Sequence, residues 1–461
     1  MHVCTHATLT RMTPTPTVDP LLAAPILPTL IRFAVPNMGA MVASALAAIA
    51  ETRYVGTLGV GALAGMALVF PMVMLQGMLS GGAMGGGISS AVSRAFGAGD
   101  VARANALAVH ATWIAIAAGL LLMVLMLVFG GAIYSTLGGS GEALAQALVF
   151  SNVAFLGSLG MWLVNTFASV IRGSGNMAVP SGVFLAMAAT QLLVGGALGL
   201  GFGPLPSLGM PGIAAGQVVA TGAGALFLYG YLRSGRARVQ LRMRATPLQP
   251  QLLRDILKVG ALACIAPLQT VLVILILTRL VAHSGSTALA GYGIGTRLEF
   301  LLVPIVFAIG VASVPLVGTA IGAGRVARAR QVAWVASAVA AVLLGLIGVA
   351  LALAPGMWTH LFTDDAAVLA SAALYFHWAG PCYALYGLGL CLYFSSLGAG
   401  KVGGPVLAGT LRLLLVAVGG WMLATHHAEP WAIFALVALA MAVYGIASAV
   451  AMHVADWGVE R

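Results

Sequence analysis

The chain has 461 residues, of which 61% are hydrophobic and only 7% are charged. Soluble domains carry about 25% charged residues, so this composition excludes a soluble globular protein and indicates one that crosses a membrane several times. The formal net charge of +10 could indicate nucleic-acid binding. The basic residues lie between long apolar runs, however, where membrane orientation explains them better, and we expect no nucleic-acid partner.

The chain begins with a tail rich in Thr and Pro, residues 1–27. This tail lacks the apolar core of a signal peptide, and we expect it to be disordered and cytoplasmic. Twelve apolar runs follow, and each is long enough to cross a bilayer as a helix of about 20 residues. They lie at about 30–56, 60–92, 105–130, 144–170, 178–202, 209–232, 256–282, 288–319, 330–354, 368–394, 404–425 and 430–455. Uninterrupted runs favour helices over strands, so we predict an all-α integral membrane protein.

A basic segment, residues 233–255, separates the first six predicted spans from the last six. We therefore predict an N-lobe of helices 1–6 over residues 28–232 and a cytoplasmic linker over 233–255. A C-lobe of helices 7–12 follows over residues 256–455, and a short cytoplasmic tail over 456–461 ends the chain.

A short polar turn occurs twice, which indicates that the two lobes are copies of one unit. Residues 96–104 and 321–329 share the pattern Gly-Ala-Gly-x-Val-Ala-Arg-Ala, at a spacing of 225 residues (321 − 96). Three further pairs keep nearly this spacing: Ala-Leu-Ala-Gly at 62–65 and 288–291, Thr-Arg at 52–53 and 278–279, and Gly-x-Gly with a following Pro at 173–180 and 398–405. Four matches in one order indicate an internal repeat. The glycines could instead cradle a phosphate, but no strand precedes them and no Lys-Ser/Thr follows. Tight turns between helices are the simpler interpretation.

The basic residues predict the orientation of the chain. Besides the linker arginines, the loops of one face carry Arg94, Arg103, Arg172, Arg325, Arg328, Arg330 and Lys401. The loops of the other face (131–143, 203–208, 283–287, 355–367 and 426–429) contain neither Lys nor Arg. The positive-inside rule then places both termini and the linker in the cytoplasm. We expect the protein to lie in the plasma (inner) membrane. An anionic-lipid or nucleic-acid patch is the alternative role for the linker. An even number of spans gives both lobes the same orientation around a central cleft.

Only two of the 11 acidic residues lie within apolar runs, namely Glu51 and Glu299. An ionisable group inside a membrane is costly and is usually functional. The repeat spacing pairs residue 51 with Leu277 rather than with Glu299. The two lobes are therefore chemically unequal.

Glu51 is the best candidate for ion coupling. A carboxylate that is shielded from water favours its neutral form unless a cation is close, so it could exchange a proton or Na⁺ for a substrate. The alternative is a fixed ion pair with Arg53 or another basic side chain. Residues two apart do not face each other on a helix, which makes Arg53 a poor partner within the helix.

Glu299 has two interpretations that the sequence leaves open. It follows Arg297 and precedes Pro304, whose missing donor can bend a helix. The side chain could bind a substrate or an ion, or it could form a structural pair with Arg279 or Arg297.

At these residues the chain resembles the multidrug and toxic compound extrusion (MATE) family. The matching stretches are Glu51-Thr-Arg-Tyr-Val-Gly-Thr-Leu-Gly, Ala95-Phe-Gly-Ala-Gly, Ile171-Arg-Gly-Ser-Gly-Asn, Leu205-Pro-Ser-Leu-Gly-Met-Pro-Gly-Ile-Ala-Ala, Ile321-Gly-Ala-Gly, Leu361-Phe-Thr-Asp-Asp and Leu397-Gly-Ala-Gly-Lys. The resemblance covers most of residues 28–455. It implies twelve helices in two lobes arranged as a V, with efflux of organic cations driven by entry of H⁺ or Na⁺.

The resemblance also implies site residues. The family often has an Asp in its first helix, and Glu51 occupies that place. Many members have an Asn and, four residues later, an Asp in the fifth helix, where this chain has Gln191 and Gly195. Some members carry a Glu in the seventh helix and an Asp in the tenth, which we place at Gln269 and Tyr386. A lone carboxylate fits H⁺ coupling better than a full Na⁺ cage, although water and carbonyl oxygens could complete a Na⁺ site near Glu51.

We therefore predict a secondary active antiporter, not an enzyme, that exports organic cations or amphipathic drugs by alternating access. Glu51 couples the ion, and the predicted cavity residues are Asn37, Gln191, Gln269, Glu299 and Tyr386. Arg53, Arg279 and Arg297 are predicted to be structural or gating charges. We expect a monomer with no cofactor apart from the coupling ion. A lipid-linked saccharide flippase is the alternative within transport, and a membrane-embedded enzyme is the alternative outside it, although no catalytic constellation is visible within a span.

Overall fold

The computed structural model describes residues 20–201, 206–243, 246–426 and 429–458, and within these ranges its regular structure is helical. The helices of the first half are α1 (Pro20–Ala23), α2 (Ile26–Thr57), α3 (Val60–Gly77), η1 (Met78–Met84), α4 (Gly85–Gly97), α5 (Val101–Thr136), α6 (Gly141–Leu156), α7 (Ser158–Gly173), α8 (Ala178–Leu200) and α9 (Met210–Arg233). Those of the second half are α10 (Pro250–Ala263), α11 (Ile265–His283), α12 (Ser286–Gly322), α13 (Val326–Leu353), α14 (Gly356–Thr359), α15 (Ala366–Ala399), α16 (Gly403–Thr425) and α17 (Pro430–Val454).

These helices confirm the twelve predicted spans. Eleven continuous stretches are long and apolar enough to cross a membrane, with α3, η1 and α4 forming one stretch and α10 and α11 another. The twelfth span is the pair α6 and α7, which bends by 47° at Gly157. Two predicted boundaries need correction. Residues 20–23 and 26–27, which we expected in a disordered tail, are helical, while residues 1–19 lie outside the described residues. The helix after the linker begins at Pro250 rather than at 256.

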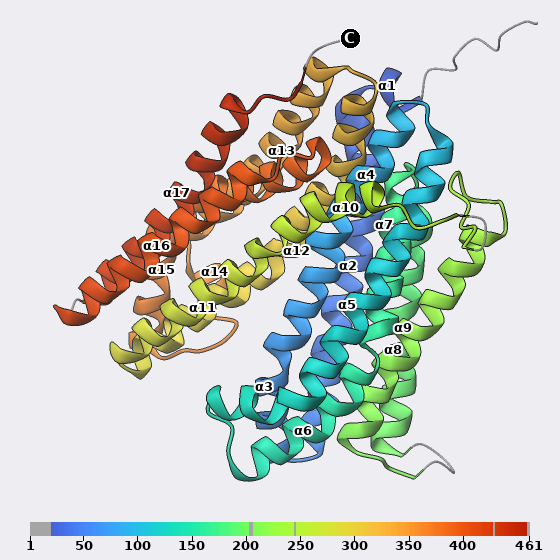
Figure 1. The fold of residues 1–461 in the computed structure, drawn as a ribbon. Coiled ribbons are helices and arrows are strands. Elements are labelled where there is room, and N and C mark those ends of the chain that lie inside the picture. Colours follow the sequence, from blue (N-terminus) through green and yellow to red (C-terminus); the bar gives the residue numbers. More distant parts are fainter. Residues whose placement is uncertain (1–19, 202–205, 244–245, 427–428, 459–461) are drawn as a thin grey trace, which may run out of the picture.

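The helices form two lobes that approach each other at one end (Figure 1). Helices α2 to α9 pack mainly among themselves, as do α11 to α17. The lobes meet through α2 and α4 against α12 at the end where α1 and the linker lie, and their ribbons diverge toward the other end. We call the first the basic end, because the loops there carry the basic residues. The V shape agrees with the expectation from the family resemblance.

The two Gly-Ala-Gly turns have the same geometry at the basic end. Gly99 and Gly324 have φ angles of 75° and 74°, a left-handed conformation that glycine adopts without strain. The amide of Asp100 donates to the carbonyl of Ala95, and that of Arg325 to Ala320, each at 2.9 Å. Such long-range bonds close a helix at a C-terminal glycine. Both motifs are therefore tight connections between two helices, as the simpler interpretation held.

The linker is attached to the N-lobe. Val239 and Leu241 are buried in the core formed by α4, α5, α7 and α9. The backbone amide of Gln240 donates to Asn105 Oδ1 at 2.7 Å, and that of Gln249 donates to His110 Nε2 at the same distance. Helix α10 continues this attachment, because it packs on α4 and α5 before α11 joins the C-lobe. Any rocking of the lobes must therefore occur after α10 rather than within the linker.

Close backbone contact joins the lobes at the basic end. A Cβ atom on Gly97 would overlap the carbonyl of Thr319 in α12, and one on Gly322 would overlap the carbonyl of Arg94 in α4. These two glycines are repeat equivalents, since 225 residues separate them (322 − 97). Small residues permit helices in membranes to approach this closely. The interface therefore depends on residues that carry no side chain.

An ion pair at this end, between Arg103 of α5 and Asp255 of α10, helps to hold α10 on the N-lobe. Both side chains are well exposed, and an exposed pair stabilises a protein by about 0 to 1 kcal/mol. We therefore expect Asp255→Asn to change the thermal unfolding temperature of the purified protein by no more than a few degrees. A loss of folding or of all transport in this variant would show that the pair contributes much more than an exposed ion pair is expected to contribute.

Candidate functional site

Glu51 is a buried carboxylate between two helices of the N-lobe. It lies near the end of α2 that is remote from the basic end, and only 5% of its surface is exposed. The side-chain amide of Gln191 in α8 donates a hydrogen bond to Glu51 Oε2 at 2.6 Å. The other oxygen, Oε1, is buried and has no hydrogen-bond partner. The structure thus brings together the two residues that the family resemblance placed in one site.

The fixed ion pair that we considered for Glu51 is not formed. Arg53 is exposed on the surface of α2, and no described basic side chain lies within 4.0 Å of the Glu51 carboxylate. An uncompensated charge in a buried position costs several kcal/mol, roughly, per ion. Binding of a proton or a metal cation by Glu51 would therefore remove this energetic cost.

The equivalent position in the C-lobe has no polar group. The repeat pairs Glu51 with Leu277 and, at a spacing of 225 residues, Gln191 with Val416. Both C-lobe residues are buried in the hydrophobic core. The two lobes therefore differ chemically at this position, as predicted. The N-lobe has a carboxylate and an amide where the C-lobe has two apolar side chains.

The place of the second carboxylate in the family pattern is tightly packed in this structure. This place is Gly195, where α8 and α9 approach closely. A Cβ atom there would lie 3.1 Å from the carbonyl oxygen of Ile213, and Gly195 faces Gly216 across the contact. A side chain at residue 195 would require the neighbouring backbone of α9 to shift slightly. The missing carboxylate therefore coincides with a close contact between two helices.

A cavity of about 250 Å³ lies between the lobes and contains two of the other predicted residues. Helix α3 and η1 contribute Met74 and Met78 from the N-lobe, while α11, α12, α15, α16 and α17 form the rest of its wall. Glu299 and Tyr386 line this cavity, and so does Arg412. Glu299 and Arg412 are the only charged side chains among its lining residues. We call it the interlobe cavity.

Glu299 is bound by tyrosines rather than by arginines. The hydroxyl groups of Tyr375 and Tyr383 both donate to Glu299 Oε1, the second at 3.4 Å. Arg279 is exposed on α11, and the exposed guanidinium of Arg297 lies 5.2 Å from the centre of the Phe362 ring. The predicted structural pair of Glu299 with either arginine is therefore not formed.

Two predicted cavity residues lie elsewhere. Asn37 is 14 residues before Glu51 on the same helix (51 − 37), or about 21 Å along its axis, and its amide donates to the carbonyl of Ala308 at 3.5 Å across the lobe interface. Gln269 is buried between α11 and α16, where its amide donates to Thr410 Oγ1 at 2.7 Å. Both residues hold helices together in this conformation, and neither lines the interlobe cavity.

The sequence did not identify Arg412 as a cavity residue. A functional role for Arg412 is inferred from the structure alone. Its guanidinium carbon lies 5.2 Å from the centre of the Tyr386 ring and 5.7 Å from that of the Tyr444 ring. Aromatic residues from α15 and α17 thus flank an arginine from α16. The sequence feature that could have indicated a role for Arg412 is its position within an apolar run, because a charged residue is energetically costly in a membrane.

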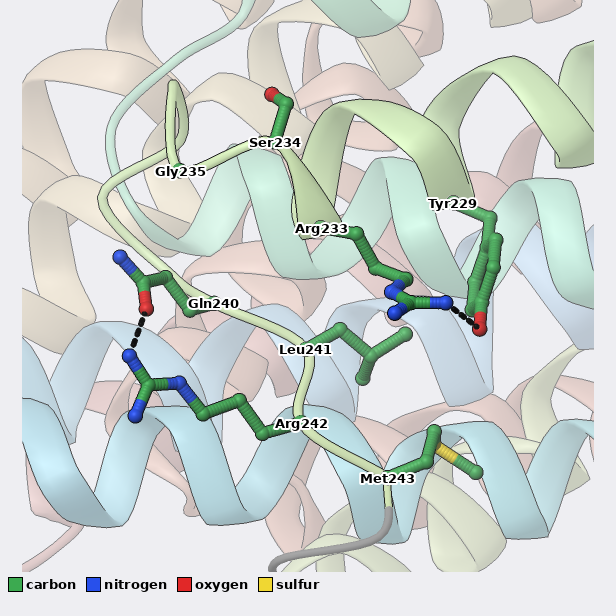
Figure 2. A pocket seen from close by; sticks show the side chains of 8 residues that line it. All are labelled: Tyr229, Arg233, Ser234, Gly235, Gln240, Leu241, Arg242 and Met243. Atoms are coloured by element: carbon green, nitrogen blue, oxygen red, sulfur yellow. Dashed lines mark hydrogen bonds between the residues drawn. The ribbon is translucent and has the colours of Figure 1, made fainter.

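A larger cavity of about 660 Å³ lies at the basic end and is formed by the end of α9 and the linker (Figure 2). Arg233 there donates to the Tyr229 hydroxyl at 3.4 Å, and Arg242 donates to Gln240 Oε1 at 2.7 Å. Glu51 lies toward the opposite end of the molecule. The alternative role of the linker as an anionic-lipid patch stays a prediction, and this cavity is separate from the buried carboxylates.

The fold and the site define a duplicated helical membrane transporter with one buried carboxylate in its N-lobe. The chain belongs to the MATE family, because the family model MatE matches residues 36–195 and 263–422. The two matched stretches lie in different halves of the chain, in agreement with the internal repeat.

Curated relatives and solved structures agree with this assignment. The chain is 27% identical over 387 residues to the FAD transporter of Shewanella oneidensis, covering 82% of each protein. It is 27% identical over 351 residues to the probable multidrug resistance protein NorM of Thermotoga maritima, covering 74% of this chain and 73% of the relative. A MOP superfamily transporter from Pyrococcus furiosus has the same fold, with a TM-score of 0.85 at 20% identity over 94% of this chain and 96% of its own. Members of this family are transporters, so the chain is a membrane transporter for small molecules.

Proposed function

We propose that the chain is a secondary active antiporter that exports organic cations or amphipathic compounds in exchange for H⁺ or Na⁺. The observation that carries the proposal is Glu51, a buried carboxylate with one oxygen bound by Gln191 and the other unpartnered. Such a group binds a cation from one side of a membrane and releases it to the other only if the protein changes conformation. We place the basic end in the cytoplasm, in the inner membrane, and propose that the protein works as a monomer.

The donor set near Glu51 supports H⁺ as the coupling ion. Among the described residues, no group of three or more His, Cys, Asp or Glu side chains could hold a metal ion. Na⁺ would need several oxygen ligands, which water and backbone carbonyls would have to supply. A proton needs only the free Oε1 of Glu51. We therefore propose H⁺ as the ion that Glu51 carries, with Na⁺ as the competing possibility that the experiment separates.

The interlobe cavity supports the choice of an amphipathic substrate. Its N-lobe wall includes Met74 and Met78, whose flexible thioether side chains adapt to different apolar ligands. The family's relatives include proteins named for multidrug export and for FAD transport, so a substrate with an extended aromatic part is within the family's range. Only one arginine, Arg412, lines the cavity, which gives no support to the alternative of a lipid-linked saccharide flippase with a basic cavity.

The proposed cycle links the two sites through the lobes. With the basic end closed, as in this structure, Glu51 takes up H⁺ from the outer side and the substrate leaves the interlobe cavity. The lobes then separate at the basic end, Glu51 releases its proton to the cytoplasm, and the cavity loads again. Each half of the cycle needs the other, because an ion bound in one lobe and a substrate between the lobes bias the same conformational equilibrium.

Reconstituted vesicles test this proposal directly. The purified chain is placed in proteoliposomes, and counterflow of a fluorescent amphipathic dye is measured against an imposed pH gradient and, separately, against an imposed Na⁺ gradient at constant pH. We expect the pH gradient to drive dye movement and an uncoupler to abolish it. Dye movement driven by Na⁺ alone would correct the ion. No movement under either gradient would contradict the proposed antiport.

A further inference from the structure

Arg412 occupies an unusual position for a positive charge in this chain. It lies in the middle of α16, is 9% exposed, and lines the interlobe cavity. Its guanidinium group lies against the rings of Tyr386 and Tyr444. The contacts with the two rings are attractive, and they are stronger the further the pair is removed from water. The rings orient the guanidinium, but they do not neutralise its charge.

The charge of Arg412 has no direct partner among the described residues. Its buried Nε atom has no hydrogen-bond partner, and no described carboxylate oxygen lies within 4.0 Å of the guanidinium. Glu299 lines the same cavity and interacts electrostatically with Arg412. It forms no ion pair with the guanidinium group within 4.0 Å, and its Oε1 accepts hydrogen bonds from Tyr375 and Tyr383. Buried charges in proteins are normally paired. An arginine that is buried, oriented and unpaired beside a cavity is suited to pair with a ligand.

We propose that Arg412 binds the acidic group, a carboxylate or a phosphate, of the transported molecule, which is therefore an amphipathic acid with an aromatic part. Arginine suits this role because its planar guanidinium presents parallel donors that match the oxygens of either group. The aromatic part of the ligand lies along the apolar wall, between Met78 of the N-lobe and Phe307 of the C-lobe. This inference rests on the proposed transport function and specifies its substrate class.

The position of the site also explains how release of such a ligand is linked to the movement of the lobes. Arg412 belongs to the C-lobe, whereas Met74 and Met78 face it from the N-lobe. A ligand that contacts both walls is released when the lobes rearrange, because only one conformation holds the two walls at this distance. The acidic group provides the stronger contact, and the aromatic part provides the contact that changes between states.

Equilibrium binding tests the proposal without requiring transport. Full-length protein in detergent is titrated with flavin mononucleotide and with riboflavin, which share the same ring system and differ by the phosphate group. Carboxyfluorescein serves as the carboxylate ligand and ethidium as an aromatic cation. The variants are Arg412→Gln and Arg412→Lys, and the matched control is Arg236→Gln, an exposed arginine of the linker.

We expect the wild-type protein to bind at least one of the two acids more tightly than riboflavin. Arg412→Gln should weaken binding of that acid by about 10- to 100-fold, the range for a hydrogen bond to a charged group, and should leave riboflavin binding unchanged. Arg412→Lys should restore part of the affinity, and Arg236→Gln should bind as the wild type. The better acid identifies whether the site prefers a phosphate or a carboxylate.

Three results would overturn the inference. They are failure of the wild-type protein to bind either acid, equal affinity of the wild type for the acids and for riboflavin, or an Arg412→Gln variant whose affinities for ethidium and riboflavin fall by the same factor as its affinity for the acid. The comparison of ligands on the wild-type protein remains decisive if Arg412→Gln does not fold. Binding of the acid without any gradient-driven counterflow would support this site while contradicting the antiport, so the two failures are distinguishable.

Discussion

Glu51→Gln is expected to yield a folded transporter that no longer couples substrate movement to the ion gradient. The amide has nearly the same shape as the carboxyl group and can remain next to Gln191, whose side chain now contacts a neutral partner. It cannot take up or release a proton, so the imposed gradient has no group on which to act. We expect counterflow driven by a pH gradient to fall on the order of 100-fold, near the upper end of coupling free energies between two sites.

The pH dependence of substrate release provides a second measurement for the same prediction. In the wild-type protein, acidification of the outer side should accelerate substrate release, because protonation of Glu51 there favours the substrate-free state. In Glu51→Gln the release rate should not depend on the outer pH. Glu429→Gln is the matched control, since Glu429 is an exposed carboxylate at the start of α17. Full pH-driven counterflow in Glu51→Gln would show that another group carries the ion.

The sequence predicted the fold well because its signals are local. A span is recognised from about 20 consecutive apolar residues, and the bend between α6 and α7 does not interrupt that signal. The repeat was visible because turns such as 96–104 and 321–329 need glycine at the same place in each copy. The linker was less predictable. Its Val239 and Leu241 are isolated apolar residues in a basic segment, and their burial depends on a surface that the other N-lobe helices create.

The candidate site was only partly predictable, since it depends on pairs of helices. Glu51 stood out as a charge in an apolar run, and Gln191 followed from the family pattern. Arg53 and Arg412 look alike in sequence, as arginines within apolar stretches, yet one is exposed and the other is buried beside a cavity. Arg412 lies against Tyr386 and Tyr444, which belong to two other helices. Contacts between an arginine and aromatic rings have no spacing rule, so only the structure reveals them.

Gly322→Ala is expected to shift the transporter away from the conformation in which the basic end is closed. The added methyl group would overlap the Arg94 carbonyl, which belongs to the backbone of α4 and cannot turn away as a side chain can. Overpacking of this kind costs about 1 to 3 kcal/mol, which corresponds to about a 5- to 150-fold change in the ratio of closed to open states. Gly97→Ala should act in the same way, because its Cβ atom would overlap the carbonyl of Thr319 on the partner helix.

Cysteine accessibility measures this shift. The four native cysteines are replaced, and a single cysteine is introduced at Ser90, which is buried at the interface and donates to the carbonyl of Gly398 at 3.1 Å. An impermeant maleimide added to the basic end should label Ser90→Cys about tenfold faster when Gly322→Ala is present. Gly182→Ala is the control, since a Cβ atom there meets no other atom within 4 Å.

The dependence of labelling on salt separates two ways of closing the basic end, by exposed charges or by backbone contact at the two glycines. Closure by ion pairs would weaken as salt is added, because exposed charges are screened. Closure by backbone contact should be nearly independent of salt and should respond strongly to a single methyl group. Labelling of Ser90→Cys that rises with salt but not with Gly322→Ala or Gly97→Ala would contradict the role of the glycines. The opposite result would show that close packing of α4 and α12 sets the conformational equilibrium on which exchange at Glu51 depends.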